Sequence, residues 1–246
     1  MKTLILKFAL LGTVVVASPF ALTPAALADN ARMYEVTITN ATHGQPVAPS
    51  VIATHTDAFR LFELGPAPVV GDSGYDAYFA LATMAEAGYP FLVLDEVAAS
   101  PGVWEAQVLA TDRTPPVLLP GESNHLTIGA RGNTKYLSAV AMLGATNDAI
   151  YAVRGVALPR GIGDTVRVFA DAYDAGSEVN AESPDTVGAL GAMDDNPLTG
   201  AGINENGEGY IHVHAGIHGI GGMDGLDPAT FDWRNPVVEV IIERIQ

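Results

Sequence analysis

The sequence predicts a mainly β protein built as an antiparallel β-sandwich, and three features lead to this prediction. Most candidate strands are short and are separated by Gly, Pro or Asn. After residue 100 strands and helices do not alternate regularly, which disfavours a parallel α/β sheet. The chain has 246 residues, of which 48% are hydrophobic, and this is enough for a sizeable core. We therefore expect one sandwich domain.

The N-terminus has the pattern of a secretory signal peptide. Lys2 and Lys7 precede an apolar run from Phe8 to Val16, and Ala26-Leu27-Ala28, with its two small residues, follows. The apolar run is shorter than the about 20 residues that a membrane span needs. We expect cleavage after Ala28, export to the periplasm or outside the cell, and a mature domain of residues 29–246 without a transmembrane segment.

Strands are predicted from short β-branched and aromatic runs that end at turn residues. The first runs from Met33 to Thr39, with alternation along its length, and ends at Asn40. The later candidates are Val103 to Ala110, Asn124 to Ala130, Tyr136 to Leu143, Ile150 to Leu158, Thr165 to Ala170, Tyr210 to His214 and Val237 to Ile245.

Two helices are predicted in the first third of the chain. One covers Asp57 to Leu64 and ends at Gly65-Pro66, and the other covers Asp76 to Ala87 and ends at Gly88. We expect them to form a small helical insertion near residues 57–88. A long irregular loop is predicted from Gly176 to Gly209, because Gly, Asn, Asp and Pro are frequent there and periodicity is weak.

Charge and cysteine content exclude several classes of function. Without Lys2 and Lys7 the 12 basic residues become 10, against 28 acidic ones, so the formal charge falls from −16 to −18. Such a charge repels nucleic acid and attracts cations, and we expect no nucleic-acid partner. The chain contains no cysteine, which excludes disulfides, thiol catalysis and thiolate metal ligands.

Two acidic turns carry the chemistry that calcium prefers. Asp171 to Glu178 reads Asp-Ala-Tyr-Asp-Ala-Gly-Ser-Glu, and Thr146-Asn147-Asp148 forms an earlier turn. Calcium takes six to eight oxygen ligands at about 2.3–2.6 Å, and acidic residues on turns beside a glycine supply them. Asp, Asn and Gly also form turns without an ion. Because both segments end apolar runs, neighbouring loops of one sheet edge can meet, and we treat the pair as a candidate calcium site.

These segments resemble the spondin domain. Tyr136 to Leu143, Thr146 to Tyr151 and Tyr173 to Glu178 follow its pattern of a strand ending near a Met, a turn with an Asp and an aromatic residue, and a later Asp-Ala-Gly motif. Further segments that resemble bacterial members are Leu81 to Gly88, Pro120 to Ser123 and Asp232 to Pro236. The likeness covers most of the mature chain, although Ser177 replaces the more usual Thr.

The resemblance implies an antiparallel β-sandwich similar to the calcium-binding, phospholipid-binding sandwiches. It also implies a calcium site at Asp148 and Asp174, with Glu178 at a third acidic position, while Asp171 matches no family position and is held as a spare ligand. Animal members belong to secreted matrix and adhesion proteins. This chain lacks their cysteines and accompanying repeats, so their partners do not carry over.

Three histidines form a second candidate site. His212 and His214 are two residues apart in a predicted strand and share a face, and His218 follows in the next turn. Together they provide ligands for zinc or copper, and Asp224 or Asp227 is available to complete a set. The alternative is that these histidines lie on a solvated face or form local hydrogen bonds.

The sequence favours a binding protein over an enzyme. No Gly-x-Ser-x-Gly elbow, phosphate loop or dinucleotide fingerprint occurs in a supporting context. We expect an exported, calcium-binding, non-enzymatic module of the spondin type, which acts in adhesion at the cell surface or in an extracellular matrix through an unidentified protein or glycan partner. The alternative is an exported transition-metal enzyme centred on His212, His214 and His218.

Overall fold

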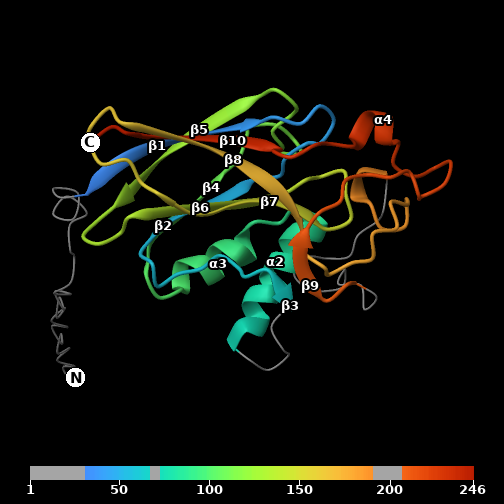
Figure 1. The fold of residues 1–246 in the computed structure, drawn as a ribbon, viewed down its shortest axis with the longest axis horizontal. Helices are drawn as coiled ribbons and strands as arrows, with labels where there is room; N and C mark the ends of the chain where they lie inside the picture. Colours follow the sequence, from blue (N-terminus) through green and yellow to red (C-terminus); the bar gives the residue numbers. More distant parts are fainter. Residues whose placement is uncertain (1–30, 67–72, 191–206) are drawn as a thin grey trace, which may run out of the picture. The chain divides into compact units, whose positions relative to one another are not determined.

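The fold is mainly β and sandwich-like, with one antiparallel sheet that curls until its two edges nearly meet (Figure 1). The computed structural model describes residues 31–66, 73–190 and 207–246. Within this part Ala31–Gln246 form one compact unit. The predicted signal peptide, residues 1–28, lies outside the described residues. The predicted sandwich class is confirmed.

The elements follow one another in a simple order. The strands are β1 (Arg32–Asn40), β2 (Ser50–His55), β3 (Gly65–Pro66), β4 (Val103–Leu109), β5 (Ser123–Ala130), β6 (Tyr136–Met142), β7 (Ala149–Ala157), β8 (Thr165–Asp174), β9 (Tyr210–Val213) and β10 (Val238–Arg244). The described helices are α2 (Ser73–Ala87), α3 (Phe91–Ala99), the short 3-10 helix η1 (Gly188–Leu190) and α4 (Pro228–Phe231).

The sheet runs in the order β4-β2-β6-β7-β8-β10-β1-β5, and the short β9 pairs with both β8 and β3. Its two edge strands approach each other through side chains. Gln107 Nε2 of β4 donates to the Thr127 carbonyl of β5 at 3.0 Å. The backbone N–H of Gly129 donates to Glu105 Oε2 at 2.8 Å. These bonds cover edges that would otherwise be open to pairing with another chain.

The main core lies between the two halves of the curled sheet. In β1 the residues Tyr34, Val36 and Ile38 alternate with more exposed ones and are fully buried. They face the core together with alternate residues of β10, because the register pairs Val36 with Ile242 and Ile38 with Val240. The period of two that predicted the first strand therefore reflects one buried face.

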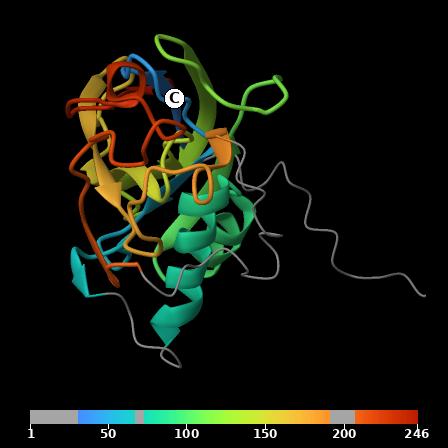
Figure 2. The ribbon, with the colours of Figure 1, turned by 90° about the vertical axis from the view of Figure 1, so that its right-hand side faces the viewer.

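A second core lies between the sheet and two helices, α2 and α3 (Figure 2). Val140 of β6 and Ile150 of β7 point away from the main core and belong to the same buried cluster as Leu81 and Met84 of α2. Because both faces of β6 are covered, all but the first of its residues are buried. The first five residues of β7, which follow the acidic turn, are buried in the same way.

The prediction of a helix at Asp57 to Leu64 is wrong. Those residues form turns and bends, and the helical insertion consists of α2 and α3 instead. The Arg60 guanidinium, through Nη1, donates to the carbonyls of Asp57 and Phe59 at 2.6 and 3.0 Å, and Phe59 is buried in the second core. A segment of this length cannot sustain an isolated helix, so the burial of Phe59 and the local hydrogen bonds of Arg60 decide its conformation.

The seven later predicted strands and the first one are confirmed with small shifts at their ends, the largest being the extension of β8 to Asp174. The elements β2 and α3 were not predicted, nor were the short β3, η1 and α4. The predicted loop from Gly176 to Gly209 is irregular where it is described, apart from η1, and residues 191–206 lie outside the described part.

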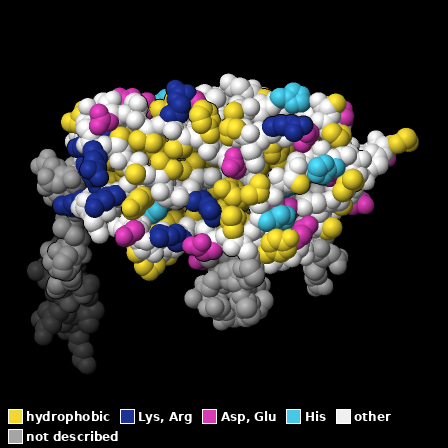
Figure 3. Space-filling view, viewed as in Figure 1, with side chains coloured by type: hydrophobic (Ala, Val, Ile, Leu, Met, Phe, Trp, Pro, Cys, Tyr) yellow, Lys and Arg dark blue, Asp and Glu magenta, His cyan; other side chains and the backbone are white. Residues whose placement is uncertain are grey.

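The surface is mixed in character. On the face in Figure 3, acidic side chains are scattered between basic and hydrophobic ones and do not form one continuous patch. Among the described helices, none combines the length and apolar character that crossing a membrane requires.

Candidate metal centre

Sheet pairing brings the two predicted acidic turns together at one end of β7 and β8. Ala149, the first residue of β7, pairs with Asp174, the last residue of β8, so the turn that holds Asp148 lies beside Asp174. The turn is held by Thr146, whose hydroxyl donates to the Leu143 carbonyl at 2.6 Å and accepts from Ala149 N at 3.1 Å. The expected meeting of the two turns is therefore observed.

Three carboxylates form one group that could hold a metal ion. Asp148, Asp174 and Glu208 each present an oxygen, and these oxygens all lie within 4.8 Å of one another. Asp148 and Asp174 are 0% and 1% exposed, whereas Glu208 is exposed. Burying two like charges side by side is unfavourable unless a proton or a cation compensates them.

Asp148 has one satisfied and one unsatisfied oxygen. Its Oδ2 accepts hydrogen bonds from the backbone N–H groups of Ser177 and Glu178, at 2.8 and 3.0 Å, and from the Ser177 hydroxyl at 3.3 Å. Its Oδ1 is buried and has no hydrogen-bond partner within the described residues. A buried polar atom without a partner costs about 1–3 kcal/mol, so such atoms are rare unless an ion or a water completes them.

Burial raises the pKa of Asp148 from 3.8 to about 7, and the adjacent Asp174 carboxylate acts in the same direction. The N–H groups of Glu178 and Ser177 oppose the shift, because they stabilise the charged form. A cation beside Oδ1 would act in the same direction as these N–H groups. The hydrogen bonds to Asp148 are thus too few to stabilise its ionised form, and a cation would supply the missing stabilisation.

Asp174 organises the turn that follows β8. Its Oδ1 accepts from Gly176 N at 2.7 Å, and its Oδ2 accepts from Asn180 Nδ2 at 2.5 Å. The same Asn180 amide group lies 3.3 Å from Glu208 Oε1 and so links the two carboxylates. Gly176 has φ +69°, and a Cβ on it would lie 2.2 Å from the Tyr210 carbonyl oxygen. Only glycine fits at this position.

The structure places the other predicted calcium ligands differently. Glu178 contributes its backbone N–H to Asp148 and is not in the group of three carboxylates, where Glu208 provides the third. Asp171 is exposed and three residues before Asp174, on the opposite face of β8. Glu208 was not predicted. The available signal was its position two residues before β9, the strand that pairs with the end of β8.

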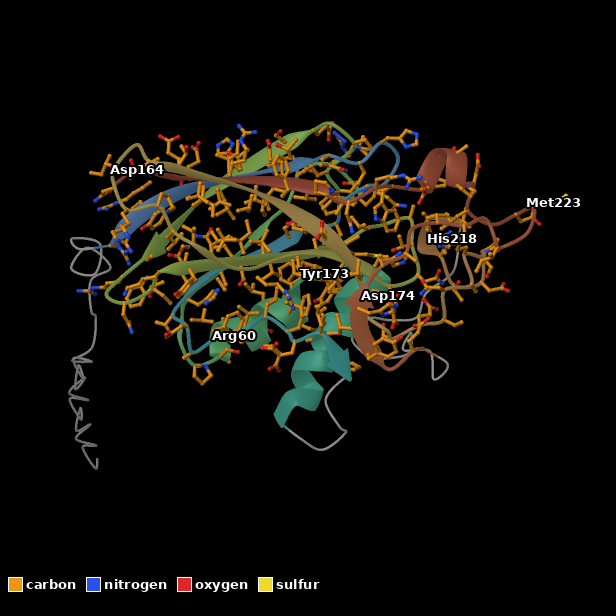
Figure 4. All side chains as sticks on the ribbon, viewed as in Figure 1. Arg60, Asp164, Tyr173, Asp174, His218 and Met223 are labelled. Carbon is orange, nitrogen blue, oxygen red and sulfur yellow. The ribbon has the colours of Figure 1, made fainter. Side chains whose placement is uncertain are left out.

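Two of the three predicted histidines lie next to the acidic group. Asp174 pairs with His212 in the β8–β9 ladder. His212 Nε2 is 3.8 Å and His214 Nε2 is 3.9 Å from Asp174 Oδ2. His218 lies in the loop beyond β9 (Figure 4) and donates its backbone N–H to Glu182 Oε1 at 2.7 Å. Within the described part of the chain, the three imidazoles do not bring their nitrogens within 4.8 Å of one another.

Hydrogen bonds fix which nitrogen of each ring carries the proton. The Gly216 N–H donates to His214 Nδ1 at 2.9 Å, so a neutral His214 carries its proton on Nε2, toward Asp174. Burial lowers the pKa of His214 to about 4, which keeps the ring neutral. His212 Nδ1 faces the Tyr210 carbonyl at 3.3 Å and therefore donates, which leaves a lone pair on Nε2. Of these two rings, it is a neutral His212 whose Nε2 could bind a metal ion beside Asp174.

Glu182 holds the histidine loop against the acidic turn. It is buried and has φ 53°, a left-handed conformation that is unfavourable for a residue other than glycine. Its carboxylate accepts from His218 N and Ile220 N at 2.7 and 3.0 Å, and its own N–H donates to Asn147 Oδ1 at 3.2 Å. Sequence reasoning missed this residue, which connects the turn of Asp148 to the loop after β9.

Neither the models of known protein families nor the curated proteins give a match to this chain. The resemblance to the spondin domain therefore stays a prediction that rests on the segments named above. The geometry of the acidic group, in contrast, does not depend on that resemblance.

Proposed function

We propose that this protein is an exported, calcium-binding module of the spondin type that acts by binding an extracellular protein or glycan and not by catalysis. The observation that carries the proposal is the buried Oδ1 of Asp148, which has no partner within the described residues and belongs to a group with Asp174 and Glu208. A cation at this position satisfies the free oxygen and offsets the repulsion between the carboxylates.

The donor set favours calcium over a transition metal. All three groups are carboxylates, and backbone carbonyls and water complete calcium shells readily. A zinc or copper site built from His212, His214 and His218 requires a lone pair on each ring. His214 Nδ1 already accepts from Gly216, so its Nε2 carries the proton and cannot bind a metal without loss of that bond.

The site also suits a structural ion better than a catalytic one. Asp148 and Asp174 accept four hydrogen bonds from the backbone and from the Asn180 side chain of the loop after β8, so the carboxylates tie that loop to the turn before β7. An ion bound there stabilises the native state and fixes the surface formed by the loops. We infer that this fixed loop surface is the binding face.

The test is thermal unfolding of the protein after chelator treatment, with calcium, magnesium, zinc, copper and nickel added back one at a time. We expect calcium to raise the unfolding temperature and Glu208→Gln to weaken that effect, because the exposed Glu208 contributes to the ion and little to packing. Asp112→Asn, which changes an exposed carboxylate outside the group, is the matched control. Identical unfolding with calcium and with chelator would contradict the proposal.

One observation favours a second candidate, the transition-metal enzyme. His212 Nε2 lies 3.8 Å from Asp174 Oδ2, so a metal ion could bind both atoms, and the Nδ1–H of the neutral ring is held by a carbonyl, as is usual for histidine ligands. Stabilisation by zinc or copper alone, abolished by His212→Ala, would replace calcium with this candidate.

A further inference from the structure

A cavity of about 370 Å³ lies on the helix side of the sheet and shares no residue with the metal centre. It is formed by the end of β2, the turns of residues 56–63, the start of β6 and the end of β7. Its lining includes His55, Arg60, Phe62, Tyr136, Ser138 and Arg154. Its volume is within the range of sites for small molecules.

A buried chain of hydrogen bonds forms the floor of this cavity. His55 Nδ1 lies 2.7 Å from the Thr56 carbonyl and must donate to it, so the neutral ring accepts at Nε2 from the Ser138 hydroxyl at 2.8 Å. Burial lowers the pKa of His55, which keeps the ring neutral. Ser138 Oγ in turn accepts from Gly155 N at 2.9 Å. Because both functions of the hydroxyl are used, we read Ser138 as a positioning residue and not a nucleophile.

This network stabilises a bulge that aims one arginine over the cavity. The β6–β7 register jumps between Leu137 and Ala139, so that Arg154 and Gly155 both lie opposite Ser138. Gly155 has φ +75°, and the N–H that the bulge removes from the ladder is the one that Ser138 accepts. Bulges of this kind redirect side chains near binding sites.

Arg154 then lies over two aromatic rings. Its guanidinium carbon is 5.0 Å from the centre of the Phe62 ring and 5.4 Å from that of Tyr173. Stacking holds the planar group while leaving its N–H edge available for a planar oxyanion. Its only protein hydrogen bond within the described residues is a long one of 3.4 Å to the Phe62 carbonyl.

Arg60 provides a second guanidinium at the same cavity, and Figure 4 shows both Arg60 and Tyr173 on the helix side of the sheet. Arg60 donates from Nη1 to two backbone carbonyls, and its Nη2 and Nε groups are available to bind an anion. Neither arginine forms a salt bridge with a carboxylate in the described part of the chain. Asp57 and Glu63 also line the cavity and are exposed, as are Arg60 and Arg154, so water screens all four charges alike, and what distinguishes Arg154 is its stacking on two rings.

We propose that this cavity binds a small molecule that carries one oxyanion, a carboxylate or a phosphate, on an aromatic or similarly apolar body. Arg154 and Arg60 bind the oxyanion, and Phe62 and Tyr136 contact the apolar body. In a chain of formal charge −16 the general field repels anions, whereas at this cavity two arginines without a salt bridge in the described residues balance the charges of Asp57 and Glu63. This site is independent of the proposed calcium function.

The test is an NMR titration of the full protein with three probes of similar size: benzoate, phenyl phosphate and the uncharged benzamide. We expect saturable shifts around the cavity with one or both anions, binding at least about tenfold weaker for benzamide, and a loss of about tenfold in anion affinity in Arg154→Gln. Arg167→Gln, which removes an arginine of β8 that is paired with Glu239 of β10, is the matched control and should bind normally.

Several results would overturn the proposal: no saturable shift with either anion, equal binding of benzamide, or an equal loss in Arg167→Gln. If Arg154→Gln does not fold, Arg60→Gln tests the same prediction from an exposed turn. The titration is run both with calcium and with chelator. We expect the same anion affinity in both conditions, so that this inference can be judged separately from the calcium proposal.

Discussion

Replacing Asp148 by Asn should stabilise the protein in chelator and abolish its stabilisation by calcium. In the substituted protein the amide oxygen can keep the hydrogen bonds that Ser177 and Glu178 donate to Oδ2. The amide nitrogen then takes the position of the unsatisfied Oδ1 and can donate to the neighbouring carboxylates. An amide at this position therefore suits the ion-free protein better than an ionised Asp148 does, but it lacks the charge that holds calcium.

The size of the effect follows from the pKa of Asp148, which burial and Asp174 raise from 3.8 to about 7. Between these pH values the native protein holds a proton that the unfolded chain has released, so native stability falls as the pH rises. The penalty is complete above pH 7. At 1.36 kcal/mol per pKa unit, the difference corresponds to about 4 kcal/mol. For a domain of this size, a gain of this free energy should raise the unfolding temperature of Asp148→Asn by about 10 °C relative to the ion-free wild type.

The assay is thermal unfolding of both proteins as a function of pH, in chelator and in excess calcium. In chelator the two should unfold at similar temperatures below about pH 4 and diverge as the pH rises toward 7, with the Asn protein the more stable. Calcium at 100 times its Kd should stabilise the wild type by about 2.7 kcal/mol and leave Asp148→Asn unchanged. An Asn protein that is less stable in chelator above pH 7, or one that still responds to calcium, would refute this reasoning.

Three further predictions concern the surroundings of the site and the core. Tyr151→Phe leaves the buried Ser50 hydroxyl without its donor at 2.8 Å and should cost about 1–3 kcal/mol by denaturant unfolding, with part of the loss recovered when Ser50→Ala is added; full additivity would contradict it. Glu182→Ala should cost about 2–3 kcal/mol and Glu182→Gln less, because the amide keeps an acceptor for the loop N–H groups; equal losses would argue against the hydrogen bonds as the cause. His214→Gln should flatten the loss of stability as the pH falls from about 6.5 to about 4, since burial lowers the pKa of His214 to about 4 and only the unfolded chain binds a proton in that window; an unchanged acid limb in thermal scans would be inconsistent with it.

One-sided burial made β1 readable in the sequence, whereas β2 and α3 were missed for separate reasons. The alternation of β1 was readable because one face is buried and the other is not. β2 is buried along its whole length, between the curled sheet and the helices, so its residues show no period of two. In α3 only Val93 and Val97 are buried, four residues apart, and a segment of nine residues with so few buried positions does not separate helix from strand.

For the candidate site, local sequence patterns identified some residues, and long-range contacts determined the others. Asp148 and Asp174 were identified because each lies on a turn that ends a strand. Glu208 joins them only because β9 pairs with β8, a contact that bridges more than thirty residues of loop. The place of Glu182 depends on a left-handed backbone conformation that its residue type does not suggest. No local pattern carries that kind of information.

Turn formation explains part of the acidic motif without an ion. Gly176 is required because the start of β9 passes too close for a Cβ, and Asp174 is suited to its position because it accepts the Gly176 N–H. Turn formation and strand packing thus account for two of the residues that suggested a calcium site. They do not account for the unpaired Oδ1 of Asp148. An Asn at this position would avoid the unpaired oxygen at no cost to the turn. The choice of Asp over Asn at position 148 is therefore the point at which the sequence favours a cation.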